Sequence, residues 1–152
     1  MPCKLKHAGW PTELDSHRWG VILAGGDGKR LLPLTRCITG DDRPKQFCAL
    51  TGGDTLLRQT RQRVGRAIPR SQTLLVLTRT HERYYADEAT GVPSSCLLIQ
   101  PHNPSFSQEV LSARPCDLAV IRARSLGWSD LGEPERVSSV LRFKSEAANG
   151  EG

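Results

Sequence analysis

Six residues between positions 25 and 45 have types and spacing suited to phosphate chemistry. They are Gly25, Gly26, Gly28, Lys29, Arg30 and Lys45. Glycine lacks a Cβ, so a glycine-rich loop can adopt positive φ and bring consecutive N–H groups close to one anion. The three cations would then surround the mouth of that loop. The pattern predicts a phosphate-binding loop, and the alternative is a plain strand-to-helix turn.

Two better-known phosphate loops do not fit this sequence. A Walker loop requires Ser or Thr after its Gly-Lys pair, and here Arg30 follows Lys29. A dinucleotide-binding fingerprint requires a third glycine, and Leu31 occupies that position. The loop must therefore belong to another class.

The longer pattern GGxGxRLxPLT, which ends at Thr35, is followed by RPKQF at residues 43–47. Together they resemble the signature of the sugar-phosphate nucleotidyltransferases, and among these the mannose-1-phosphate guanylyltransferases, in which RPKQF is typical. The resemblance implies a Rossmann-like three-layer α/β/α fold. It also implies GTP and a sugar 1-phosphate as substrates, with Mg²⁺ as cofactor.

The resemblance also implies roles for individual residues. Arg30 and Lys45 would be catalytic and offset charge on the departing pyrophosphate, although an exposed lysine without a role remains the alternative for Lys45. Gln100 maps to a position that reads the base, where a side-chain amide can both donate and accept. The expected nucleotide-binding residues are Leu23, Ala24, Gly25, Gly26, Gly28, Arg30, Lys45 and Gln100.

The likeness is interrupted near residues 103–106, where an internal segment of the family is absent. The missing part includes an acidic motif that supplies one magnesium ligand, and much of the sugar-binding half. Asp130, in WSDLG, matches the second metal position, and its carboxylate is a suitable magnesium donor. The alternative for Asp130 is a turn or helix-capping aspartate.

The elements that would position these residues follow from hydrophobic patterning. We expect a central strand at residues 19–24, an irregular segment from the glycine loop to Asp42, and parallel strands at residues 73–78 and 96–100. A strand at residues 118–123 should join the same sheet. A helix should run from Asp54 or Thr55 to about Ile68, and His81 should be structural or exposed.

Composition limits the remaining possibilities. The chain has 152 residues and a net charge of +5, with scattered arginines that are more typical of a solvated surface than of nucleic-acid binding. Five cysteines without CxxC spacing fit reduced thiols in a cytoplasm, and no apolar run is long enough for a membrane span. We expect a disordered leader at 1–17, a nucleotidyltransferase-like domain at 18–142 and a flexible tail at 143–152, and leave the oligomeric state open.

Two hypotheses follow. The chain is either a guanylyltransferase-like enzyme whose activity is impaired by the missing middle, or an inactive nucleotide-binding or non-functional remnant. Pyrophosphate release and nucleotide binding are the observations that distinguish them.

Overall fold

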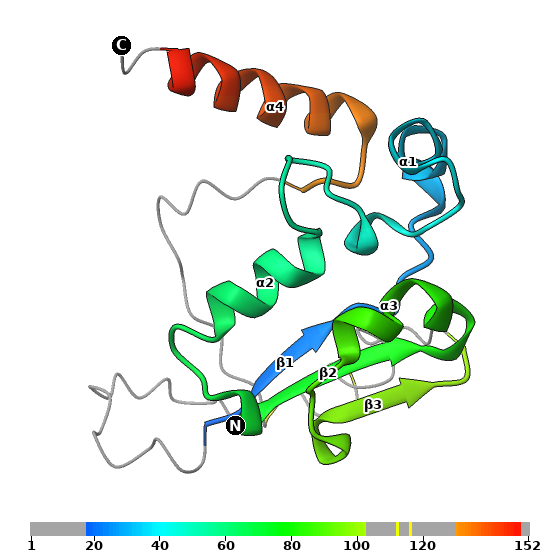
Figure 1. Cartoon of the computed structure of the whole chain (residues 1–152), viewed down its shortest axis with the longest axis vertical. Coiled ribbons are helices and arrows are strands. Elements are labelled where there is room, and N and C mark those ends of the chain that lie inside the picture. The colour runs from blue at the N-terminus through cyan, green and yellow to red at the C-terminus, as the bar shows by residue number, and fades with distance from the viewer. Residues whose placement is uncertain (1–17, 103–111, 113–115, 117–129, 150–152) are drawn as a thin grey trace.

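A computed structural model of the chain describes residues 18–102, Ser112, Cys116 and residues 130–149 (Figure 1). The strands are β1 (Gly20–Leu23), β2 (Thr73–Thr78) and β3 (Leu97–Gln100). The α-helices are α1 (Leu32–Thr39), α2 (Leu56–Val64), α3 (Glu82–Ala89) and α4 (Pro134–Asn149). Along the longest axis of the molecule, α4 lies at the opposite end from the sheet (Figure 1).

The three strands form one parallel sheet in the order β1-β2-β3. The three strands predicted within the described residues are therefore present and parallel, within a residue or two of the expected bounds. The strand predicted at residues 118–123 lies outside the described residues. Among the described strands β2 occupies the middle, so the expectation that residues 19–24 form a central strand is not met there.

Helix α1 corrects the prediction of an irregular segment up to Asp42. Pro33 lies in the first turn of this helix, where a missing N–H costs nothing, so it does not break the helix. Gly40 ends the helix with a left-handed φ of 78° and donates its N–H to the Arg36 carbonyl. A proline at this position is compatible with a helix start, so the segment after the glycine loop is helical and not irregular.

Helix α2 begins as predicted but ends earlier. The Thr55 hydroxyl accepts the backbone N–H of Arg58 at 3.1 Å, which caps the helix. The helix ends at Val64, because Gly65 has low helix propensity and the following amides of Ala67 and Ile68 both turn back to the Val64 carbonyl. The predicted end at Ile68 is therefore too late.

The main hydrophobic core lies between one face of the sheet and helices α2 and α3. It is formed by Ile22, Ala24, Phe47, Leu57, Leu75, Leu77 and Tyr85. On the opposite face, Val21, Leu23 and Leu98 are 52%, 51% and 47% exposed, so the described helices cover one face of the sheet. The α/β class is confirmed, whereas the described residues form two layers and do not establish the predicted third.

A second cluster joins α4 to the segments that follow the glycine loop. Its buried members are Leu31, Cys48, Leu50 and Val137. Helix α4 continues to Asn149, well into the segment predicted to be a flexible tail, so the domain boundary at residue 142 falls inside a helix. Among the described residues, no helix has the length and apolarity needed to cross a membrane.

Candidate nucleotide-binding site

The glycine loop is held by side chains that bind its carbonyl groups. Gln46 donates from Nε2 to the carbonyls of Ala24 at 3.0 Å and Gly26 at 2.7 Å. The Thr78 hydroxyl donates to the Gly25 carbonyl at 2.9 Å. Because the C=O and N–H of one planar trans peptide point in opposite directions, the amides of Gly25 and Asp27 face away from Gln46. These two N–H groups are therefore directed to the side of the loop opposite Gln46.

A cavity of about 390 Å³ opens beside this loop. It is lined by Gly26, Asp27, Gly28, Lys29, Arg30, Leu31, Lys45 and Gly132. Gly28 has a left-handed φ of 63°, and a Cβ built there would lie 3.3 Å from the backbone N of Lys45. Glycine at position 28 therefore permits both the turn and the close approach of the segment that carries Lys45.

Lys45 and Arg30 both reach across to one short segment far along the chain. Lys45 Nζ donates to the Leu131 carbonyl at 3.0 Å. Arg30 Nη1 lies 2.6 Å from Glu133 Oε1, and both side chains are substantially exposed. The structure thus brings the two predicted catalytic cations to the same cavity, and each of them is held by a residue of the 131–133 segment.

Asp130 lies beside this pair of contacts. A Cβ added to Gly132 would meet Arg30 Nη2 at 3.0 Å and the two Asp130 carboxylate oxygens at 3.1 and 3.2 Å. The predicted metal residue is therefore close to the predicted catalytic arginine. Its Oδ2 is also 3.5 Å from Nη1 of Arg136, which lies in the first turn of α4.

The described residues supply few metal ligands. No group of three or more His, Cys, Asp or Glu side chains comes together among them to hold a metal ion. Magnesium commonly takes one or two carboxylates and completes its shell with substrate phosphates and water. Asp130 is an oxygen donor of the right type, so the site fits an ion that arrives with a nucleotide better than one held by protein alone.

His81 contacts the glycine loop through Asp27. It is buried, its Nε2 is 3.4 Å from Asp27 Oδ1, and its ring meets Phe47 edge-on. Burial lowers the pKa of His81, while the neighbouring Asp27 carboxylate opposes that shift. The expectation of a structural His81 agrees with this packing, and its contact with the loop was not foreseen.

Gln100 is less closely connected to the cavity. It ends β3 with its backbone in register with Thr78, the residue that binds the Gly25 carbonyl. Strand β2 thus separates Gln100 from the strand that leads into the glycine loop, and Gln100 does not line the 390 Å³ cavity. Leu23 and Ala24 lead into the loop, where the Ala24 amide bonds to the Val76 carbonyl. A base-reading role for Gln100 stays a prediction.

Sequence reasoning missed two functional positions in this site. Gln46 was quoted within RPKQF without a role, although a side-chain amide beside a glycine loop could have been read as a donor to loop carbonyls. Glu133 gave no local signal, because its partner Arg30 is 103 positions earlier. Contacts of that separation depend on how α4 packs, which periodicity does not reveal.

Comparison with known proteins finds a family that resembles the segment carrying this site. The nucleotidyl transferase family model matches residues 19–92 of the chain. The match covers the glycine loop, Arg30 and Lys45. The resemblance to sugar-phosphate nucleotidyltransferases predicted from the motifs is thereby confirmed.

Individual relatives extend the comparison. The alginate biosynthesis protein AlgA of Pseudomonas aeruginosa is 40% identical over 96 residues, which is 61% of this chain and 19% of that protein. AlgA of Pseudomonas putida is 54% identical over 96 residues, with the same shares. The chain spans about a fifth of the length of these curated relatives. No solved structure gave a significant match.

Proposed function

We propose that this chain binds GTP at the cavity beside the glycine loop and is a guanylyltransferase-type nucleotidyltransferase with impaired turnover. Its reaction would convert GTP and mannose 1-phosphate to GDP-mannose and pyrophosphate. One observation carries the proposal: the glycine loop, Lys45 and the 130–133 segment, separated along the chain, line or border one cavity that is also lined by Lys29 and Arg30. The family match over residues 19–92 supports it.

In the proposed reaction, an oxygen of the sugar phosphate attacks the α-phosphorus of the nucleotide in line. A new P–O bond forms, the bond between the α-phosphorus and its bridging oxygen breaks, and pyrophosphate leaves with the electron pair. Catalysis of this kind consists mainly of positioning and charge stabilisation. The amides of Gly25 and Asp27 would bind phosphate oxygens, and Arg30 and Lys45 would stabilise charge on the leaving pyrophosphate.

For Arg30 to reach a phosphate it must exchange Glu133 for the nucleotide. The pair is 71% and 46% exposed at its two side chains, and such surface pairs contribute about 0–1 kcal/mol. The exchange is therefore inexpensive. Asp130 would bind Mg²⁺, and that ion would supply charge neutralisation at the phosphate oxygens.

A second candidate function, nucleotide binding without catalysis, is favoured by the carboxylates. Asp130 is engaged by Arg136 at 3.5 Å, and the described residues do not provide a group of three metal-binding side chains. A site with a single metal carboxylate holds the nucleotide but positions its α-phosphorus poorly.

The same proposal includes the fold's third layer and the location of the protein in the cell. A second helical layer would cover Val21, Leu23 and Leu98, which gives the three-layer α/β/α fold of the family. A cytoplasmic location is supported by the free thiols of Cys48 and Cys96.

The test is an assay of pyrophosphate release with GTP, Mg²⁺ and mannose 1-phosphate, beside a thermal shift with GTP and Mg²⁺. Catalysis predicts release that Arg30→Ala abolishes and Arg63→Ala leaves unchanged, because Arg63 is exposed on α2 and lines neither described cavity. Binding alone predicts a GTP-dependent rise in Tm that Lys45→Ala removes, without release. Absence of both signals refutes both functions.

A further inference from the structure

A second cavity, of about 450 Å³, lies at the amino ends of the strands. Thr73 begins β2, Arg70 lies just before it, and Pro93 precedes the turn that leads into β3. The glycine loop instead follows the carboxyl end of β1. Because the strands are parallel, the two cavities lie at opposite ends of the sheet, and this one is separate from the proposed nucleotide site.

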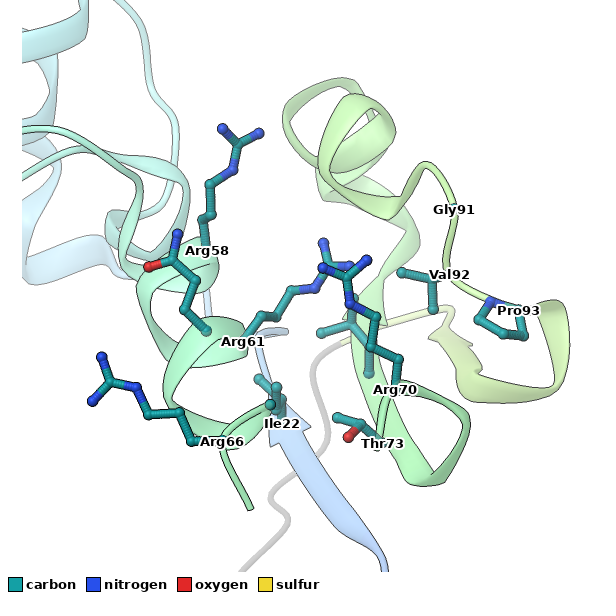
Figure 2. Close-up of a pocket in the computed structure, with 12 residues that line it drawn as sticks. Ile22, Arg58, Arg61, Arg66, Arg70, Thr73, Gly91, Val92 and Pro93 are labelled. Carbon is teal, nitrogen blue, oxygen red and sulfur yellow. The ribbon is translucent and has the colours of Figure 1, made fainter. Parts of the chain in front are cut away.

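Four arginines surround this cavity, and two of them converge. Figure 2 shows Arg61 of α2 and Arg70 extending toward each other beside Val92, whereas Arg58 and Arg66 extend away. The pKa of Arg61 is lowered first by burial and then by the positive charges of Arg70 and Arg58, with Glu88 opposing. The positive charges of Arg61 and Arg70 therefore repel each other, and an anion between them would relieve this repulsion.

The chain supplies little anionic compensation here. Among the described residues, Asp54 pairs with Arg58 at 3.4 Å, and no carboxylate lies within ion-pair distance of Arg66 or Arg70. Arg61 donates to the backbone carbonyl of Glu88, while Oε1 of that carboxylate accepts the Thr55 hydroxyl. The guanidinium groups of Arg61 and Arg70 therefore have unused donors at the cavity.

The other residues that line the cavity indicate which kind of ligand it could hold. The floor is apolar, with Ile22, Leu75 and Val92, and Thr73 and Gln62 add polar groups. No aromatic ring is among the lining residues, so the cavity offers no stacking surface for a nucleobase. A guanidinium pair matches the oxygens of a phosphate group in geometry as well as in charge.

We propose that this cavity binds a small phosphorylated metabolite without an aromatic ring, such as a sugar phosphate, at a site distinct from the nucleotide site. The phosphate lies between Arg61 and Arg70, and the carbon skeleton lies on the floor formed by Ile22 and Val92. The volume is within the range of small-molecule sites in proteins. The proposal does not depend on catalysis at the glycine loop.

The experiment is an NMR titration of the ¹⁵N-labelled chain with glucose 6-phosphate, with glucose as the uncharged counterpart. The phosphorylated sugar is expected to shift the amides of Thr73, Gly91 and Val92, and glucose is not. Arg70→Glu should weaken binding by about tenfold or more, the loss expected for one charge-assisted hydrogen bond together with the introduced repulsion. Arg63→Glu makes the same charge change on the exposed surface of α2 and should leave the affinity within about twofold.

Three results would overturn the proposal. They are the absence of shifts at the cavity with glucose 6-phosphate, shifts that persist in Arg70→Glu, and equal shifts with glucose. Duplex DNA or an acidic peptide that binds these arginines while glucose 6-phosphate does not would instead make the cavity a macromolecular docking site. Arg70→Gln, which removes charge without reversal, checks that a loss in Arg70→Glu does not reflect misfolding, because it should give an intermediate affinity with an unchanged spectrum elsewhere.

Discussion

Replacing Gly28 with alanine tests how the glycine loop and the Lys45 segment fit together. Gly28 has φ 63° and ψ 23°, in the left-handed region that costs an ordinary residue about 1–2 kcal/mol. An added Cβ would also lie 3.3 Å from the backbone N of Lys45 and 3.6 Å from the Cα of Pro44. Since both neighbours are backbone atoms, the segment must shift by a few tenths of an ångström, and we expect a further cost of about 1 kcal/mol.

Two other glycines provide matched controls. Gly40 has a comparable φ of 78° but nothing within 4 Å of an added Cβ, so Gly40→Ala measures backbone strain alone. Gly26 has neither a positive φ nor a close neighbour, and Gly26→Ala should change the free energy of unfolding by less than about 0.5 kcal/mol. Urea unfolding followed by circular dichroism should rank Gly28→Ala as the least stable, then Gly40→Ala, then Gly26→Ala.

The same variants separate stability from binding. Because the added Cβ in Gly28→Ala would displace Lys45, we expect this variant to lose the GTP-induced rise in Tm. Gly40 is remote from the cavity, so Gly40→Ala should keep that rise. If Gly28→Ala and Gly40→Ala were equally stable, the close approach of the two segments would contribute nothing, and the reasoning about position 28 would be wrong.

Three further predictions follow from single contacts. Glu133→Gln should tighten GTP binding by about two- to fivefold, since it frees Arg30 from an exposed ion pair; unchanged affinity by calorimetry would contradict this. Thr55→Ala should lower the free energy of unfolding by about 2–4 kcal/mol, because it removes the α2 cap and the 2.6 Å bond to Glu88, whereas Thr55→Ser should lose much less in the same urea titration. The lowered pKa of His81 means that the unfolded chain takes up a proton more readily than the folded one as pH falls below about 6.5, so stability should decline there, and His81→Gln should flatten that decline in pH-dependent melting.

The sheet was predictable because its signals are local. The run TLLVLT at residues 73–78 is continuous in β-branched and leucine side chains, and the strand has those bounds in the structure. The start of α2 was predictable for the same reason, since Thr55 is a favourable cap directly before an apolar repeat. Helix α1 was missed because the sequence signal of Pro33 is ambiguous between a helix start and a break.

The site was predictable only in part. The glycine loop, Arg30 and Lys45 were predicted from motif spacing, and the structure places them at one cavity. Glu133 and the Leu131 carbonyl hold those cations, and nothing near either residue in the sequence indicates a partner 103 or 86 positions away. Sequence patterns thus identified the groups that would contact phosphate and not the groups that orient them.

The arrangement of the site follows from one apolar cluster behind it. Leu31 directly follows Arg30, Cys48 lies three residues after Lys45, and Val137 lies four residues after Glu133. Each of these side chains is about 1% exposed, so three segments that carry functional groups are anchored in the same cluster. Burial there fixes where each segment emerges, and the polar residues next to the anchors are thereby brought to one cavity. A cavity-forming change in this cluster should therefore disturb Arg30 and Lys45 together, although neither side chain is part of it.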